Sequence, residues 1–309
     1  MSDELNVILS SDDNYARHLG VAVYSLLESN RDFEKIRIFV VSNGISAENV
    51  VKLQTVVGSF GNGVLEFIDF EKWRSQLKLN MAWHISISAY ARLFVASMLP
   101  DDVRRIIYMD CDMIVRESLR SLWNTDLKGK VLGAVQDTVP LRFKDPVGVD
   151  DADKYLNSGL LLIDMDKWRQ RNLERQCMDF INGKQGQVIH HDQGVLNGVL
   201  KNEWHVLPLA NNLMTCHYIF SPKKIRKYFK DHAEFYSEEE ISEAKAHPVI
   251  LHYTPSFTTR PWVKHCVHPL RKLYWETLAK TPWAGTRPIA DTRKWYLKII
   301  EWRYRCLPF

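Results

Sequence analysis

Short apolar runs and longer amphipathic segments follow one another along most of the chain. Runs of Val, Ile and Leu predict buried strands, and apolar residues three or four positions apart predict helices. The predicted strands cover residues 5–11, 36–42, 63–69, 105–115, 131–137, 159–164 and 249–253. Helices are predicted over residues 85–99, 119–123, 165–181 and 292–306, and also after Tyr15, from about Ser46 and after residue 190. Strands that alternate with helices predict an α/β fold, with helices on both faces of a parallel sheet.

The length and composition are those of an ordinary globular protein. With 309 residues, of which 46% are hydrophobic and 25% charged, the chain has room for one large domain and an appendage. We expect the large domain over residues 1–268. A small helical segment, rich in basic and aromatic residues, is expected over residues 269–309.

The cysteines and the N-terminal residues indicate the cellular compartment in which the protein is expected. The five cysteines are scattered and form no Cys-x-x-Cys pair, which disfavours a disulfide framework or a zinc site. Residues 1–10 open with acidic residues and contain only a short apolar run, unlike a signal peptide. No segment approaches about 18 uncharged apolar residues, the length that spans a bilayer. We therefore expect a protein of the reducing cytoplasm.

An apolar run ends on two carboxylates, Asp110 and Asp112, that are separated by one residue. Alternate side chains of an extended chain point to one face, so the two carboxylates are expected about 7 Å apart. At the carboxyl end of a parallel strand, where α/β sheets bind ligands, such a pair suits Mg²⁺ or Mn²⁺. The alternative is a solvated pair, because Asp-x-Asp sequences are common.

Further residues bear on such a site. His252 ends a late strand and is either a third metal ligand or a core histidine. Arg92 either forms a structural ion pair or reaches into the same cleft. His190 and His191 are expected on opposite sides of a strand, which disfavours a metal site on the pair. No glycine-rich phosphate-binding motif follows the early strands, so a bound nucleotide would need the metal to hold its phosphates.

The last segment differs in kind from the rest. If it is helical, Trp295, Ile299 and Trp302 share one side, and Lys294, Lys298 and Arg305 share another. Such a helix either lies in the interface of a bilayer or docks onto the domain. Because the basic residues concentrate in this tail rather than along an aromatic groove, a nucleic-acid partner is not expected.

Six motifs in register resemble those of the family 8 retaining glycosyltransferases. They are Ser11–Ala16, His84–Arg92, Tyr108–Asp112, Tyr155–Ile163, Asp192–Asn197, and His252-Tyr253 with Arg260-Pro261-Trp262. The nearest likeness is to the bacterial lipooligosaccharide and lipopolysaccharide α-galactosyl- and α-glucosyltransferases, over most of residues 5–265. The resemblance implies a GT-A fold, a UDP-galactose or UDP-glucose donor, and Mn²⁺, with Mg²⁺ as the alternative. It also implies a glycolipid or oligosaccharide acceptor and a tail that attaches peripherally to the inner face of the cytoplasmic membrane.

The resemblance also assigns roles to residues. It implies metal ligands at Asp110, Asp112 and His252; donor contacts at Asp12, Asn14, Arg92, Asp110, Asn157, Asp192 and Arg260; catalytic roles for Gln193 and Asp192; and acceptor contacts at His84 and Asp137. Retention of configuration implies either front-face attack or a covalent step on Asp192, and the sequence leaves both open.

The chain departs from the family pattern at two places. The segment after Tyr253 lacks the glycine and lysine that usually reach the diphosphate, and Pro255 has no N–H to donate. We therefore assign the phosphate contact to Arg260, which can donate to two oxygens. Gly194 stands where the galactosyltransferases often carry an acid, which leaves the choice of donor open. The acceptor is expected to depend on Asp137 and the loop over residues 143–153.

Two other functions remain as alternatives. A haloacid-dehalogenase-type phosphatase also has an apolar strand and Asp-x-Asp, but it needs Thr or Val where this chain has Ile114. A sugar-nucleotide-binding protein that has lost catalysis is the second alternative, and the altered loop at Pro255 is its only support.

Overall fold

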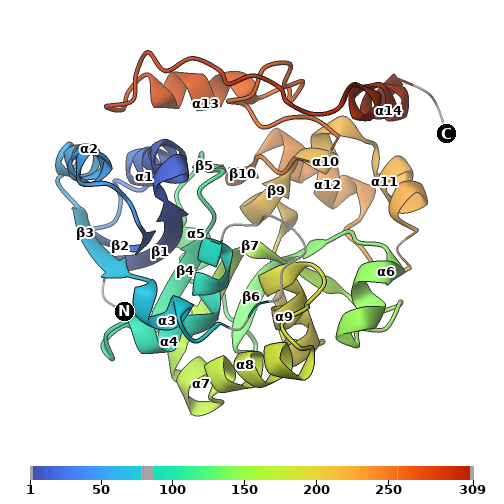
Figure 1. Cartoon of the computed structure of the whole chain (residues 1–309), viewed down its shortest axis with the longest axis horizontal. Coiled ribbons are helices and arrows are strands. Elements are labelled where there is room, and N and C mark those ends of the chain that lie inside the picture. The colour runs from blue at the N-terminus through green and yellow to red at the C-terminus, as the bar shows by residue number, and fades with distance from the viewer. Residues whose placement is uncertain (1–2, 78, 80–86, 231, 256, 307–309) are drawn as a thin grey trace.

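A seven-stranded sheet forms the centre of the computed structural model, which describes residues 3–77, 79, 87–230, 232–255 and 257–306 (Figure 1). Across the sheet the strands are β3 (Gly63–Asp69), β2 (Lys35–Asn43), β1 (Glu4–Asp12), β4 (Arg105–Met109), β7 (Tyr155–Asp164), β6 (Leu132–Asp137) and β8 (His205–Val206). Strand β7 runs antiparallel to its two neighbours, and the other pairings are parallel. The carboxyl ends of β1, β4 and β6 therefore meet at one edge of the sheet.

After β4 the chain enters a second, three-stranded sheet. It contains β5 (Met113–Val115), β10 (Ile250–His252) and β9 (Leu213–Met214), with β10 in the middle. The predicted single strand 105–115 is therefore wrong: the chain leaves the large sheet at Asp110, turns, and enters the second sheet at Met113. Asp110 and Asp112 lie on this turn, so strand alternation does not bring them together.

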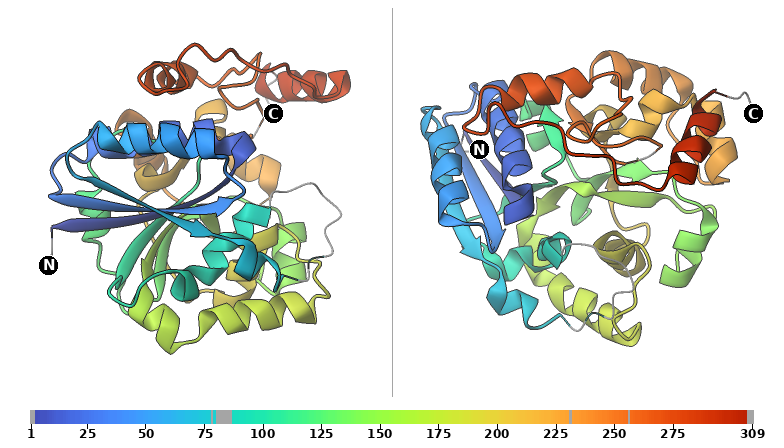
Figure 2. Two further views of the ribbon diagram at one scale, coloured as in Figure 1. Left: turned by 60° about the vertical axis from the view of Figure 1, so that its left-hand side comes forward. Right: turned by 45° about the horizontal axis from the view of Figure 1, so that its top comes forward.

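Helices cover both faces of the large sheet, as the sequence predicts (Figure 2). One face carries α1 (Ala16–Ser29), α2 (Ala47–Gly58) and, above α1, α13 (Arg271–Leu278). The other face carries the 3₁₀ segment η2 (Ile87–Phe94) with α4 (Val95–Met98), α7 (Met165–Gln170), α8 (Leu173–Gly183) and α9 (His191–Leu200). Alternation along β1 supplies both cores, since Val7 and Leu9 pack towards α1 and Ile8 packs towards the opposite layer.

The remaining helical segments range from single turns to the 12 residues of α14. They are η1 (Asp13–Tyr15), α3 (Glu71–Arg74), α5 (Arg120–Trp123), α6 (Leu141–Lys144), η3 (Asp145–Val147), η4 (Leu209–Asn212), α10 (Thr215–Ile219), α11 (Pro222–Phe229), α12 (Glu238–Ala246) and α14 (Trp295–Cys306). Among the described residues, no helix has the length and apolarity needed to cross a membrane.

Two predicted helices have a different form. The described part of the predicted helix 85–99 is mostly 3₁₀, and α4 adds a single α-helical turn. The predicted helix 165–181 is two helices, because Asn172 adopts a left-handed conformation (φ 52°) between α7 and α8.

The predicted loop 143–153 begins with helical turns. It is closed by the buried Lys144, whose Nζ donates to the backbone oxygens of Asp151 and Asp153.

The C-terminal segment packs on the first helix. Trp283 lies against Gly20, where a Cβ atom would come within 2.2 Å of the indole ring. The indole N–H of Trp283 donates to Asn49 of α2, at 3.0 Å, and Lys280 pairs with Glu28 of α1. The division of the chain at residue 268 stays a prediction.

Candidate active site

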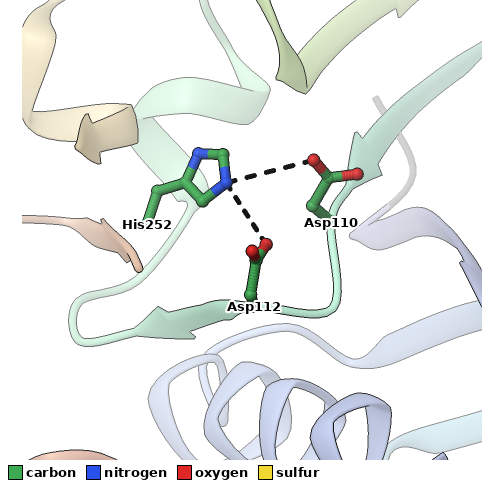
Figure 3. A group of neighbouring side chains, drawn as sticks. All are labelled: Asp110, Asp112 and His252. Atoms are coloured by element: carbon green, nitrogen blue, oxygen red, sulfur yellow. Dashed lines mark ion pairs between the residues drawn. The ribbon is translucent and has the colours of Figure 1, made fainter. Parts of the chain in front are cut away.

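Asp110, Asp112 and His252 converge where the two sheets meet (Figure 3). The imidazole Nε2 of His252 lies 3.2 Å from an oxygen of Asp112 and 4.0 Å from an oxygen of Asp110. One ligand atom from each residue falls within 4.8 Å of the other two. Two carboxylates with one imidazole suit Mn²⁺ and, less well, Mg²⁺, so these residues fit a divalent cation.

Asn212 fixes the orientation of the His252 ring. Its Nδ2 donates to Asn157 at 2.8 Å, which leaves its Oδ1 to accept the Nδ1–H of His252 at 2.9 Å. With the proton on Nδ1, the lone pair of Nε2 points towards Asp110 and Asp112. This is the usual arrangement of a metal-binding histidine, whose second nitrogen donates to a neighbouring acceptor.

The two carboxylates of the cluster differ in their electrostatics. Burial raises the pKa of Asp110, the adjacent Asp112 adds to this, and Arg92 only partly offsets it. Burial also acts on Asp112, but His252 and Arg260 outweigh it and hold the pKa of Asp112 well below its usual range. The Nε of Arg260 donates to Asp112 at 2.8 Å.

Arg92 connects this cluster to a second set of polar side chains. Its Nη2 donates to Asp110 at 2.8 Å, its Nε lies 3.0 Å from Asp192, and its Nη1 donates to the backbone oxygen of Ser158. The guanidinium is buried against the ring of Tyr108, 4.3 Å from the ring centroid. Burial alone would lower the pKa of Arg92, but Asp110 and Asp192 raise it above its ordinary value, so the side chain stays charged.

The second set joins β6, β7 and α9. One oxygen of Asp137 accepts from Asn157 and from Gln193, each at 2.9 Å. Ser158 donates its hydroxyl to Asp192 at 2.8 Å and its backbone N–H to Gln193 at 3.1 Å. Each side chain is therefore held by at least one partner, as a preorganised site requires.

These residues line one cavity of about 440 Å³, within the range of small-molecule sites. Of the predicted site residues, its walls include Arg92, Asp110, Asp137, Asn157, Asp192, Gln193, His252 and Arg260. Asp112 lies behind the wall, and Asp12 and Asn14 lie at the carboxyl end of the neighbouring β1 without lining the cavity. His84 is outside the described residues.

Two glycines are required by close packing at the site. A Cβ on Gly159 would lie 2.6 Å from the His252 ring and 2.9 Å from Asp110. A Cβ on Gly194 would lie 2.0 Å from the backbone oxygen of Ile189, which explains why this chain has no side chain there.

The sequence did not indicate several residues of the site. Ser158 lies in the motif Tyr155–Ile163 but was given no role, and Asn212 lies in none of the six motifs, although the pair Asn211-Asn212 directly before the apolar Leu213 is a weak signal. We expected His190 and His191 on a strand, and this prediction is wrong. Both have positive φ at the start of α9, and the His190 ring packs against Tyr155.

The fold matches that of GT-A glycosyltransferases. The galactosyltransferase LgtC, solved with donor and acceptor sugar analogues, aligns with a TM-score of 0.71 and 26% identity, covering 90% of this chain and 96% of that one. Residues 6–266 match Glycosyl transferase family 8, and the chain belongs to that family. The phosphatase alternative is therefore wrong.

Relatives of similar length include two bacterial proteins. General stress protein A of Bacillus subtilis (strain 168) is 29% identical over 282 residues, which cover 90% of this chain and 94% of the relative. Lipopolysaccharide 1,2-glucosyltransferase of Escherichia coli (strain K12) is 25% identical over 308 residues, covering 98% and 85%.

Proposed function

We propose that this protein is a metal-dependent, retaining hexosyltransferase. It transfers galactose or glucose from a UDP-sugar to a cell-surface glycan such as a lipooligosaccharide or lipopolysaccharide core. The observation that carries the proposal is the Asp110–Asp112–His252 cluster at the wall of one cavity, joined through Arg92 to Asp192. The similarity to a lipopolysaccharide glucosyltransferase supports the acceptor class.

The cluster provides the cation site, for Mn²⁺ or alternatively Mg²⁺. A divalent cation there neutralises charge on the diphosphate that leaves with the nucleotide. Arg260 adds to this: its Nε is held by Asp112, and its two Nη atoms have no hydrogen-bond partner among the described residues. Those two atoms are placed to donate to phosphate oxygens.

The remaining donor contacts follow from position. Asp12 and Asn14, at the end of β1, are assigned to the uridine and ribose. Arg92, Asn157 and Asp192 face the same cavity and are assigned to the hexose.

Gln193 and Asp192 are the proposed catalytic residues. Gln193 lines the cavity wall, with its carbonyl oxygen held by the Ser158 N–H and its Nε2 held by Asp137. We assign this oriented oxygen to stabilise positive charge that develops on the sugar. Asp192 Oδ2 already accepts from Ser158 and faces Arg92, and both contacts make it a weaker nucleophile. This supports front-face attack, in which the departing phosphate oxygen takes the acceptor proton. Asp137 and His84 are assigned to the acceptor.

The C-terminal helix is proposed to attach the enzyme to a membrane surface. Trp295, Ile299 and Trp302 on α14 are 72%, 53% and 58% exposed, which is unusual for such side chains in an isolated domain. The predicted basic side is partly neutralised, because Lys298 pairs with Asp291. Arg293, which flanks this side, pairs with Asp291 and Glu301. The apolar residues are thus the main proposed contacts with lipid.

Slow donor hydrolysis tests this function without an acceptor. UDP-glucose, UDP-galactose and UDP-N-acetylglucosamine are each incubated with the protein and Mn²⁺, and then with EDTA. We expect metal-dependent UDP release from one hexose donor and its loss in Asp112→Ala. If the protein binds UDP but neither releases UDP from any donor nor transfers a sugar to any glycan, the catalytically impaired binding protein would be favoured.

A further inference from the structure

Helix α11 carries a basic face that the proposed reaction does not use. Lys223, Arg226, Lys227 and Lys230 are spaced i, i+3, i+4 and i+7, so they form one stripe along the helix and its C-cap. All four are exposed, and none forms an ion pair with any other residue that the structure describes. The opposite side of the helix, with the buried Ile225, packs on the protein.

This arrangement benefits the helix only in part. Like charges at these spacings repel and destabilise a helix. Cations in the last turn interact favourably with the helix dipole, but Lys223 lies in the first turn, where the dipole opposes it. An anionic ligand would relieve the repulsion along the whole stripe.

The position of α11 links the basic face to the proposed acceptor side of the cavity. Phe229, in its last turn, lines the cavity together with Asp137 and Phe143. The segment that follows α11 is tied to the loop beyond α6 by the ion pairs His232–Asp151 and Lys154–Glu234. Figure 1 shows α11 between α14 and α6 at one side of the molecule.

The composition of the face indicates the kind of ligand. The exposed positions of α11 include no large apolar side chain, whereas α14 exposes Trp295 and Trp302. Insertion into a bilayer needs apolar residues, so α14 suits insertion, whereas α11 suits anionic groups alone. Because Phe229 of α11 lines the cavity on the proposed acceptor side, we favour an anionic group of the acceptor. Lysine and arginine side chains bind phosphate oxygens through charge-assisted hydrogen bonds.

We propose that the basic face of α11 binds a phosphate group carried by the acceptor glycan, next to the sugar that receives the hexose. This inference rests on the proposed function, since it specifies the acceptor as a phosphorylated oligosaccharide. The face then selects acceptors by their charge, while the donor site stays unchanged.

The test uses the full-length protein in EDTA, so that no metal ion binds phosphate at Asp110 and Asp112. The probes are a lipid-free lipopolysaccharide core oligosaccharide that carries phosphate monoesters, and the same oligosaccharide after removal of its phosphates. Calorimetric titration should show about tenfold tighter binding of the phosphorylated form, the size expected for one charged hydrogen-bonded contact. Combined Lys223→Gln, Arg226→Gln, Lys227→Gln and Lys230→Gln should abolish this preference.

A matched variant controls for net charge. Lys72, Lys128, Lys184 and Lys201 are exposed and lie on other elements, so their combined change to Gln removes the same charge and should keep the preference. Equal binding of both oligosaccharides by the wild type, absence of binding included, would overturn the inference. So would an α11 variant that loses binding only to phosphatidylglycerol vesicles, since the ligand would then be the bilayer.

Donor hydrolysis in Mn²⁺ separates this inference from the proposed function. Hydrolysis should be equal in the wild type and the α11 variant, because the changed residues lie outside the donor site. A wild type without hydrolysis would contradict the proposed function, whatever the oligosaccharide titrations show. A wild type that hydrolyses donor but ignores the phosphate would contradict the α11 proposal alone.

Discussion

Asn212 holds the imidazole of His252 from the side opposite to the two carboxylates. Without its Oδ1, the Nδ1 proton of His252 has no acceptor, and the ring is free to rotate or to change tautomer. We expect Asn212→Ala to weaken Mn²⁺ binding by about 10- to 100-fold, the usual cost of losing such a partner. Electron paramagnetic resonance titration of free Mn²⁺ measures this directly.

The neighbouring residue provides a control for the Asn212 prediction. Asn211 is also buried, but its Nδ2 donates to the backbone oxygen of Pro208, at 3.3 Å, and not to the cluster. Asn211→Ala should therefore leave Mn²⁺ affinity unchanged. Equal Mn²⁺ affinity in Asn212→Ala and the wild type would contradict the proposed role.

His217 should make folding sensitive to acid. It is fully buried against Phe235, and neither ring nitrogen has a hydrogen-bond partner within the described residues. Burial lowers the pKa of His217 from 6.5 to about 4. Below pH 6.5 the unfolded chain therefore binds a proton that the folded protein excludes until about pH 4, and stability falls as the pH falls through this window.

His217→Phe tests this dependence. The substitution removes the titration and keeps the ring contact, so the loss of stability between pH 7 and pH 5 should shrink by about 2 kcal/mol. Urea unfolding at the two pH values measures it, with a substitution at the exposed His247 as the control. An unchanged difference between the two pH values would show that His217 does not contribute.

At the scale of elements, the hydrophobic pattern along the chain predicts the strands whose formation depends on neighbouring residues. The strands over β1, β2, β3 and β6 follow from their apolar runs, and the structure confirms them and the α/β class. Strand β7 was predicted from residue 159 but begins at Tyr155, so its polar first half was wrongly predicted as a turn. The break between β4 and β5 was not predictable, because it depends on the pairing of Ile114 with Leu251, far along the chain. The basic stripe of α11 was readable at helical spacing, but we placed the basic residues in the tail alone.

At the candidate active site too, contacts between residues far apart in the chain could not be predicted from the sequence. Alternation on a strand was the wrong reason for placing Asp110 beside Asp112, since they lie on a turn. The motifs nevertheless identified the residues that the cavity brings together. Asn212 was missed because its role depends on contacts with two distant residues, His252 and Asn157.

The packing of the C-terminal segment on α1 depends on Gly20. Any side chain there would collide with Trp283, so Gly20→Ala should destabilise the protein by about 1–3 kcal/mol, the usual cost of overpacking. Urea unfolding measures the loss. In a double-mutant cycle, Trp283→Ala should absorb most of the effect of Gly20→Ala, because the steric conflict is then absent. Additive effects would contradict direct contact.

At the scale of the whole molecule, α11 and α14 lie on the same side, with the C-terminal segment above α1 (Figures 1 and 2). If α14 rests in a bilayer interface, α11 and the cavity wall at Phe229 are held close to that surface. A glycolipid acceptor could then reach Asp137 while its lipid stays in the membrane. Attachment would thus raise the local concentration of acceptor without changing the donor site.

Attachment through α14 should depend on apolar contact more than on charge. Lys298 and Arg293 already have acidic partners, so anionic lipid gains little from them, whereas Trp295, Ile299 and Trp302 each bury apolar surface on insertion. Combined change of these three to Ser should reduce sedimentation with phosphatidylcholine–phosphatidylglycerol vesicles by about tenfold or more. Omission of phosphatidylglycerol should have the smaller effect.

The exposed Val51, Val64 and Val267 supply the matched control for this prediction. Their combined change to Ser removes apolar surface elsewhere and should leave vesicle binding as it is, and donor hydrolysis in solution should be the same in both triple variants. Binding that survives loss of the α14 side chains but disappears without anionic lipid would show that charge attaches the protein. That charge would come from exposed cations such as Lys294 and Arg303, or from Arg293 and Lys298 once their ion pairs with Asp291 and Glu301 open.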